Sequence, residues 1–91
     1  MRSIVVEEGS IVRSVAGRDA GRLFLVTEIL DDEYVLLADG KLRKAGKPKK
    51  KKLRHIRTTG KSIREASEVI REGGCSVDAR IRSWLSNEEE M

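Results

Sequence analysis

The sequence predicts a mainly β fold: a small five-stranded barrel followed by a C-terminal α-helical hairpin. The barrel is favoured by five short segments of strand composition, joined by tight turns with no helix between them. The hairpin is favoured by helical periodicity in the last third of the chain, where Gly73-Gly74 separates two apolar faces. A chain of 91 residues has room for one small core. We therefore expect the barrel to occupy residues 1–59 and the helical hairpin, packed on it and ending in an acidic tail, residues 60–91.

The first three predicted strands are rich in Ile, Val, Leu or Phe and are bounded by Gly or Asp. They are Ser10–Ala16, Arg22–Leu30, Glu33–Ala38, Lys41–Lys44 and Leu53–Arg57, while Ile4–Val6 is either a short edge strand or cover for one end of the barrel. Gly17 and Gly21 in the first turn are expected to have positive φ. Asp39-Gly40 predicts a type I′ hairpin turn. The lysine run Lys49–Lys52, next to Pro48, is predicted to be a mobile loop.

The second and third predicted strands are apolar on both faces and therefore need cover on both sides. The C-terminal third supplies candidates for the outer cover. Ser62 and Glu65 fit a capping box, and Ser76 can cap a second helix. The two apolar helical faces are Ile63, Ala66, Val69 and Ile70, and then Val77, Ile81, Trp84 and Leu85. Glu88–Glu90 is expected to be a solvated tail.

Charge is unevenly distributed along the chain. The formal net charge is +4, yet residues 41–57 contain ten Lys or Arg and no acid. These candidate RNA-binding residues are Lys41, Arg43, Lys44, Lys47, Lys49, Lys50, Lys51, Lys52, Arg54 and Arg57. A local positive field of this kind favours binding of a polyanion. A bound polyanion would relieve the repulsion among these cationic side chains, and its counterions would be released. The alternative is a loop that merely aids solubility.

Three further residues are candidates for RNA contact. Arg18 and Arg22 flank the first turn, whose glycine amides can meet phosphate oxygens. The alternative is that Gly17 and Gly21 only reverse the chain. His55, the one histidine, could stack on a base, although an ordinary half-buried histidine is the commoner case.

Catalysis has little support in the sequence. It contains no nucleophile elbow, HExxH motif, P-loop or GxGxxG fingerprint, and the cluster Asp31-Asp32-Glu33 lies in a turn. We expect no cofactor and no metal, and Cys75, the one cysteine, is interpreted as structural or incidental. The first residues resemble neither a signal peptide nor a membrane span, which favours a cytoplasmic protein.

Residues Gly9–Leu30 resemble a KOW motif: GSIVRSVAGRDAGRLFLV has Gly21 in its central turn, flanked by apolar runs. The match continues through EYVLLADGKLRKAGKPKKKKLRHI. This longer stretch resembles the large-subunit ribosomal protein family called fourteen in the archaeal and eukaryotic series, and the small bacterial KOW RNA-binding proteins related to it. The resemblance covers Gly9–Thr59 and implies an SH3-like barrel that binds ribosomal RNA. It implies nothing about the helices.

These observations predict a non-enzymatic RNA-binding protein that acts on ribosomal RNA, as a ribosome-associated protein or an assembly factor. The expected partners are RNA and the ribosome or its proteins, and no membrane. The alternative is a KOW protein–protein interaction module of the transcription or translation machinery. In that case the helical hairpin would present Ile81 and Trp84 to a partner protein.

Overall fold

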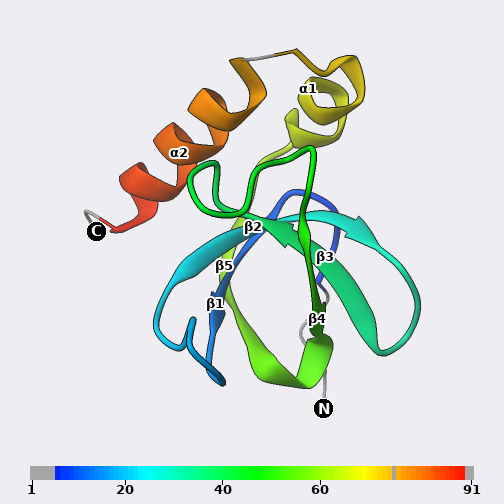
Figure 1. Ribbon diagram of the computed structural model, residues 1–91, viewed down its shortest axis with the longest axis vertical. Helices are drawn as coiled ribbons and strands as arrows, with labels where there is room; N and C mark the ends of the chain where they lie inside the picture. Colours follow the sequence, from blue (N-terminus) through cyan, green and yellow to red (C-terminus); the bar gives the residue numbers. More distant parts are fainter. Residues whose placement is uncertain (1–5, 75, 90–91) are drawn as a thin grey trace.

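The protein consists of a five-stranded antiparallel sheet followed by two helices, in a computed structural model that describes residues 6–74 and 76–89 (Figure 1). Its elements are β1 (Ser10–Ser14), β2 (Leu23–Ile29), β3 (Tyr34–Ala38), β4 (Lys49–Lys52), the 3-10 helix η1 (Leu53–His55), β5 (Ile56–Ser62), α1 (Ala66–Glu72) and α2 (Ser76–Glu89). The strand order is β4-β3-β2-β1-β5. The prediction of a mainly β fold with two following helices is confirmed. Within the described residues no ladder joins β4 to β5, so the sheet is not closed into a barrel.

The sheet is apolar on both faces, as its sequence predicts. Alternate residues of one strand enter different clusters, because successive side chains of a strand point to opposite faces. One cluster lies on the face away from the helices: Val12, Phe24, Val26, Val35, Leu37 and Ile56. The other joins the sheet to the helices: Ile11, Leu23, Leu25 and Ala38 with Ala66, Val77, Ile81 and Leu85. The helical hairpin is thus the expected outer cover.

The helices differ from the prediction mainly at their ends. The capping box is wrong, because Ser62 closes β5 and its hydroxyl donates to the Glu7 carboxylate instead of capping a helix. Helix α1 begins three residues later than that box implies, at Ala66. Gly73 ends α1 with φ +73, as predicted. Helix α2 runs to Glu89, so Glu88 belongs to a helix and not to a tail.

The second half of the sheet corrects the strand prediction. Lys41–Lys44 is not a strand, and Lys49–Lys52 is β4 and not a loop. The Asp39 carboxylate accepts hydrogen bonds from the amides of Lys41 and Arg43 and folds these residues into a turn. This side-chain turn replaces the predicted two-residue hairpin. The chain then returns as β4 antiparallel to β3.

The last predicted strand also begins and ends elsewhere. Leu53–His55 forms η1, and β5 begins at Ile56, so Thr58 and Thr59 lie inside a strand. The Thr59 hydroxyl donates to the Ile11 carbonyl across the β1–β5 pair at 2.9 Å. The predictions for Ile4, Val5, Cys75 and Glu90 concern positions outside the described residues.

Two glycines allow the C-terminal segment to approach the sheet closely. Gly9 has φ +92, its carbonyl accepts the Ile63 amide at 2.8 Å, and a Cβ there would collide with the Ile63 carbonyl. Gly40 has φ +78, and a Cβ there would collide with the Asp78 carbonyl of α2. Both positions need glycine for conformation and for space. Neither described helix is long and apolar enough to cross a membrane.

Candidate nucleic-acid interface

The four lysines of β4 are held at strand spacing, which places alternate residues roughly 7 Å apart. The register pairs Lys49 with Leu37 and Lys51 with Val35, so these two lysines share a face of the sheet. Lys50 and Lys52 share the opposite face. The Lys50 ammonium lies 4.4 Å from the centre of the Tyr34 ring, a cation–π contact. The segment is therefore an ordered edge strand with two rows of cations.

Lys49 and Lys51 reach across to the turn between β1 and β2. The Lys49 ammonium pairs with the Asp19 carboxylate, and the Lys51 ammonium donates to the Ala16 carbonyl at 3.0 Å. The first turn and the basic segment, which are about thirty residues apart in sequence, consequently form one continuous surface. These contacts brace β4, an edge strand whose lysines also discourage pairing with other chains.

The ion pair between Asp19 and Lys49 predicts an acid-sensitive contribution to stability. The hydrogen bond from Lys49, with weaker attraction from Lys51 and Arg22, holds the pKa of Asp19 below its ordinary value of 3.8, although burial opposes this shift. A lowered folded-state pKa stabilises the fold above the unfolded-state value, and the contribution is lost as the pH falls through the folded value. Asp19→Asn should lower the free energy of unfolding by about 0.5–1 kcal/mol at neutral pH.

Denaturant unfolding between about pH 2 and pH 6 measures this contribution. As the pH falls below about 4 and through the lowered pKa of Asp19, the stability of the wild-type protein should approach that of Asp19→Asn, because protonation removes the same pair. Asp32→Asn, which removes an exposed carboxylate from the β2–β3 turn, is the matched control and should follow the wild-type curve. Parallel curves for the wild-type protein and Asp19→Asn would show that the pair contributes nothing.

Backbone amides in the second half of the first turn are used within the protein. Gly17 and Gly21 have φ of +77 and +90, as predicted. The Gly21 amide donates to the Ser14 carbonyl at 2.7 Å, and the Arg22 amide donates to the Asp19 carbonyl at 2.9 Å. The Gly21 and Arg22 amides are therefore not available to phosphate, whereas the side chains of Arg18 and Arg22 are exposed.

The loop between β3 and β4 is fixed at two points by α2. Asp78 accepts a hydrogen bond from the Ala45 amide at 2.8 Å, and the Arg82 guanidinium donates to the Gly40 carbonyl at 2.6 Å. Between these points the exposed side chains are Lys41, Leu42, Arg43 and Lys44, with Lys47 just beyond. Asp78 lies in the first turn of α2, and its carboxylate holds the basic loop through the Ala45 amide.

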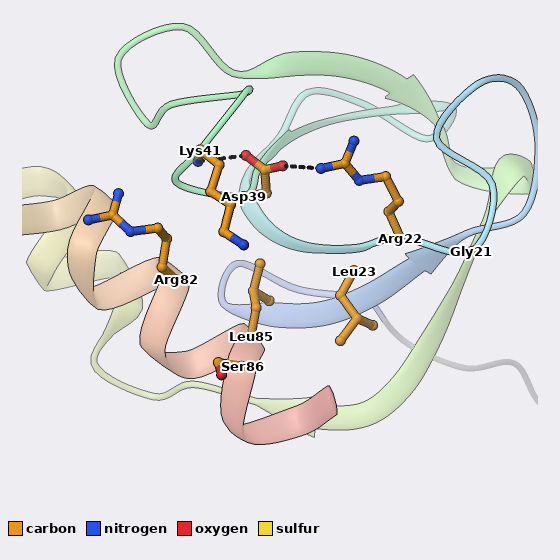
Figure 2. Close-up of a pocket in the computed structure, with 8 residues that line it drawn as sticks. All are labelled: Gly21, Arg22, Leu23, Asp39, Lys41, Arg82, Leu85 and Ser86. Atoms are coloured by element: carbon orange, nitrogen blue, oxygen red, sulfur yellow. Dashed lines mark hydrogen bonds and ion pairs between the residues drawn. The ribbon is translucent and has the colours of Figure 1, made fainter. Parts of the chain in front are cut away.

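A cavity of about 210 Å³ opens where the turn, this loop and α2 meet (Figure 2). We call it the α2 pocket. Its lining includes Gly21, Arg22, Asp39, Lys41, Arg82 and Leu85. Figure 2 shows the Lys41 side chain extending toward Leu85, between Arg82 and Arg22. The Arg22 guanidinium is turned toward Asp39, at 3.5 Å from its carboxylate.

Three predicted residues lie apart from this pocket, beyond the C-terminal end of β4. Arg54 is exposed and His55 is half-buried in η1. The exposed Arg57 donates to the carbonyls of Arg54 and Ile56, at 3.4 Å and 3.0 Å, which holds its guanidinium against η1. The basic segment therefore has two parts, one beside the first turn and α2 and one around η1.

Arg82 is a cation that sequence reasoning did not single out. It lies outside the basic segment, on a helix predicted only as cover for the sheet. The available signal was its position next to Ile81 and one turn after Asp78, which places it at the border of the apolar face. Within the described residues, no group of three or more His, Cys, Asp or Glu side chains is arranged to hold a metal ion.

No protein-family model matches the chain. It is 37% identical over 59 residues to the large ribosomal subunit protein eL14 of Desulfurococcus amylolyticus, covering 65% of this chain and 62% of that protein. Identity to eL14 of Pyrobaculum arsenaticum is 34% over 59 residues, covering 65% and 57%. For eL14 of Staphylothermus marinus it is 34% over 58 residues, covering 64% and 60%. The chain spans about three fifths of the length of these relatives. The predicted resemblance is confirmed: the chain is similar to the large ribosomal subunit protein eL14 family.

Proposed function

We propose that this protein is a non-enzymatic RNA-binding protein that associates with ribosomal RNA in the cytoplasm, as a ribosome-associated protein or an assembly factor. The observation that carries the proposal is the joining of the first turn and the lysine strand β4 into one cationic surface. Its similarity to eL14 proteins, which are by name parts of the large ribosomal subunit, supports the choice of RNA. Ribosomal RNA and the ribosome are the partners expected.

An SH3-like KOW barrel, open between β4 and β5, is the architecture we propose for residues 1–59, with residues 60–91 as the helical hairpin packed on it; β5 extends past this boundary to Ser62. Support comes from the strand order, in which β1 pairs with both β2 and β5, and from the 3-10 helix between the last two strands. In this arrangement the KOW-like turn and β4 lie side by side, because Lys49 and Lys51 both contact the turn.

The RNA surface that we propose has two kinds of residue. Side chains fixed by protein contacts orient the RNA: Arg22, Lys49, Lys51 and Arg57. Exposed or half-buried side chains with fewer protein contacts add affinity: Arg18, Lys41, Arg43, Lys44, Lys47, Lys50, Lys52, Arg54 and His55. The fixed cations lose little conformational entropy when they meet phosphate, which favours a defined orientation over loose adhesion.

Binding of ribosomal RNA fragments at increasing salt tests this proposal. If about six cations meet phosphates of single-stranded RNA, log K should fall with log salt at a slope near −4. Fluorescence polarisation with fragments of large-subunit RNA provides the measurement, and crosslinking in cells identifies the RNA that is bound. Salt-independent binding, or recovery of mRNA or DNA without ribosomal RNA, would overturn the proposal.

Lys50 and Lys52 are the best lysines to remove, because they lie on the face of β4 opposite the contacts with the first turn, although Lys50 also contacts the Tyr34 ring. Lys50→Gln with Lys52→Gln should reduce the salt slope by about 1.4 if both contact phosphate. The matched control is Lys61→Gln with Arg71→Gln, which removes the same charge from exposed positions outside the basic segment. Equal losses in the two double variants would indicate net charge alone and not a defined surface.

A further inference from the structure

Two arginines occupy directly opposite positions on neighbouring strands of the sheet. Arg13 of β1 pairs with Arg57 of β5 in the antiparallel register, and these strands lie side by side (Figure 1). Opposite residues of such a pair point to the same face, with Cβ atoms roughly 5 Å apart, so like charges there repel one another. The two strands contain a third cation, Lys61, and no acidic residue. Arg13 and Arg57, which we call the arginine pair, therefore carry a repulsion that neither strand offsets.

Backbone carbonyls hold both guanidinium groups in place. Nη1 of Arg13 donates to the Gly21 carbonyl at 2.5 Å, and Nη1 of Arg57 donates to the carbonyls of Arg54 and Ile56. Both arginine side chains are exposed, and neither forms an ion pair with a side chain that the structure describes. Because a guanidinium has five N–H donors, each arginine keeps free donors after these bonds. The arginine pair therefore suits an anion with several acceptor oxygens.

Arg13 also lies between the two parts of the basic segment. Its bond to the Gly21 carbonyl places it against the first turn, which Lys49 and Lys51 contact from the other side of the chain reversal. Its opposite residue, Arg57, belongs to the part around η1. The arginine pair consequently connects these two cationic parts across β1 and β5.

We propose that the arginine pair holds one backbone phosphate of the RNA between its two guanidinium groups. This inference rests on the proposed function and adds Arg13, which lies outside the basic segment, to the RNA surface. A shared phosphate replaces the repulsion between the arginines with two charge-assisted contacts. A phosphate of a chain is favoured over a free anion, because adjoining phosphates of the same strand can meet the cations on either side of the pair.

Arg13→Gln and Arg57→Gln, made singly and together, test whether the two arginines share a phosphate. Each single variant should bind the ribosomal RNA fragment about tenfold more weakly in fluorescence polarisation. The two losses should not add in the double variant, because both arginines contact the same group. The double variant should reduce the salt slope by about 0.7, the value for one phosphate. A reduction of about 1.4, or additive losses, would indicate two separate phosphates and would overturn the shared site.

Arg64→Gln is the matched control. Arg64 is an exposed arginine that lies beyond Ser62, the last residue of β5, and outside the basic segment. It loses the same charge and should change neither affinity nor slope appreciably. Equal effects of Arg64→Gln and Arg13→Gln would show that net charge alone matters and would overturn the arginine pair.

Arg13→Lys separates the positive charge from the geometry of the guanidinium. It should keep the wild-type salt slope but bind several-fold more weakly, because an ammonium lacks the planar fork of donors. An unchanged slope in the double glutamine variant, despite weaker binding, would mean that Arg13 only positions the first turn and would overturn the phosphate contact. Micromolar binding of inorganic phosphate, seen as shifts of the Arg13 and Arg57 Nε signals, would overturn RNA as the source. Failure of the wild-type protein to bind RNA would instead remove the proposed function.

Discussion

Replacement of Gly40 by alanine is expected to lower the free energy of unfolding by about 2–4 kcal/mol, from backbone strain and overpacking together. Gly40 has φ +78, a conformation that L-residues adopt with strain. A Cβ there would also lie 2.9 Å from Cγ of Arg82 and collide with the Asp78 carbonyl. Because the obstructing carbonyl belongs to helix backbone, α2 as a whole must move to make room. Chemical denaturation monitored by circular dichroism gives the measurement.

Gly46→Ala in the same loop is the control. A Cβ at Gly46 meets no atom within 4 Å, and its φ is not positive. Its free energy of unfolding should stay within about 0.5 kcal/mol of the wild-type value. Gly40→Ala should also weaken RNA binding, because displacement of α2 breaks the bond from Arg82 to Gly40 that holds the basic loop. A Gly40→Ala protein as stable as Gly46→Ala would contradict the close packing of α2 on this loop.

The parts of the fold that could be predicted from sequence are those specified by local pattern. The first three strands were recognised from apolar runs, and their two-sided hydrophobicity correctly indicated that helices cover the sheet. The fourth strand could not be recognised, because a run of lysines has poor strand propensity. It pairs with β3 through backbone hydrogen bonds, and contacts with Asp19, Ala16 and Tyr34 hold its side chains. Those partners are distant in sequence, so no local pattern reveals them.

The same division applies to the candidate site. Charge segregation identified the basic segment, because a count of acids and bases needs no structure. The contact between the basic segment and the first turn depends on the antiparallel pairing of β4 with β3. No local sequence pattern predicts that pairing. The Asp39-Gly40 signal was interpreted as a hairpin, whereas it forms a side-chain turn that presents Lys41 to the α2 pocket. Arg82 was missed because its role depends on where α2 docks.

Ile81→Ala should lower the free energy of unfolding by about 2–4 kcal/mol, the range for removing a fully buried aliphatic side chain. Ile81 is 0% exposed and lies in the cluster that joins α2 to Leu23 and Leu25 of β2. Loss of its methyl groups leaves a cavity between helix and sheet, where neighbouring side chains collapse only partly. Thermal and chemical unfolding measure the effect. Ile81→Val, expected to lose about 0.5–1.5 kcal/mol, provides a milder variant that stays folded.

This substitution also separates the two classes of function considered for the helical hairpin. A protein–protein module that presented Ile81 and Trp84 to a partner would need both side chains accessible, yet Ile81 is buried and Trp84 is half-buried against the same cluster. In the RNA-binding protein that we propose, Ile81 acts through stability, so Ile81→Val should bind RNA with wild-type affinity at temperatures where it is folded. Unchanged stability together with loss of a protein partner would favour the module. Reduced stability with RNA binding intact would assign Ile81 to the core between α2 and the sheet.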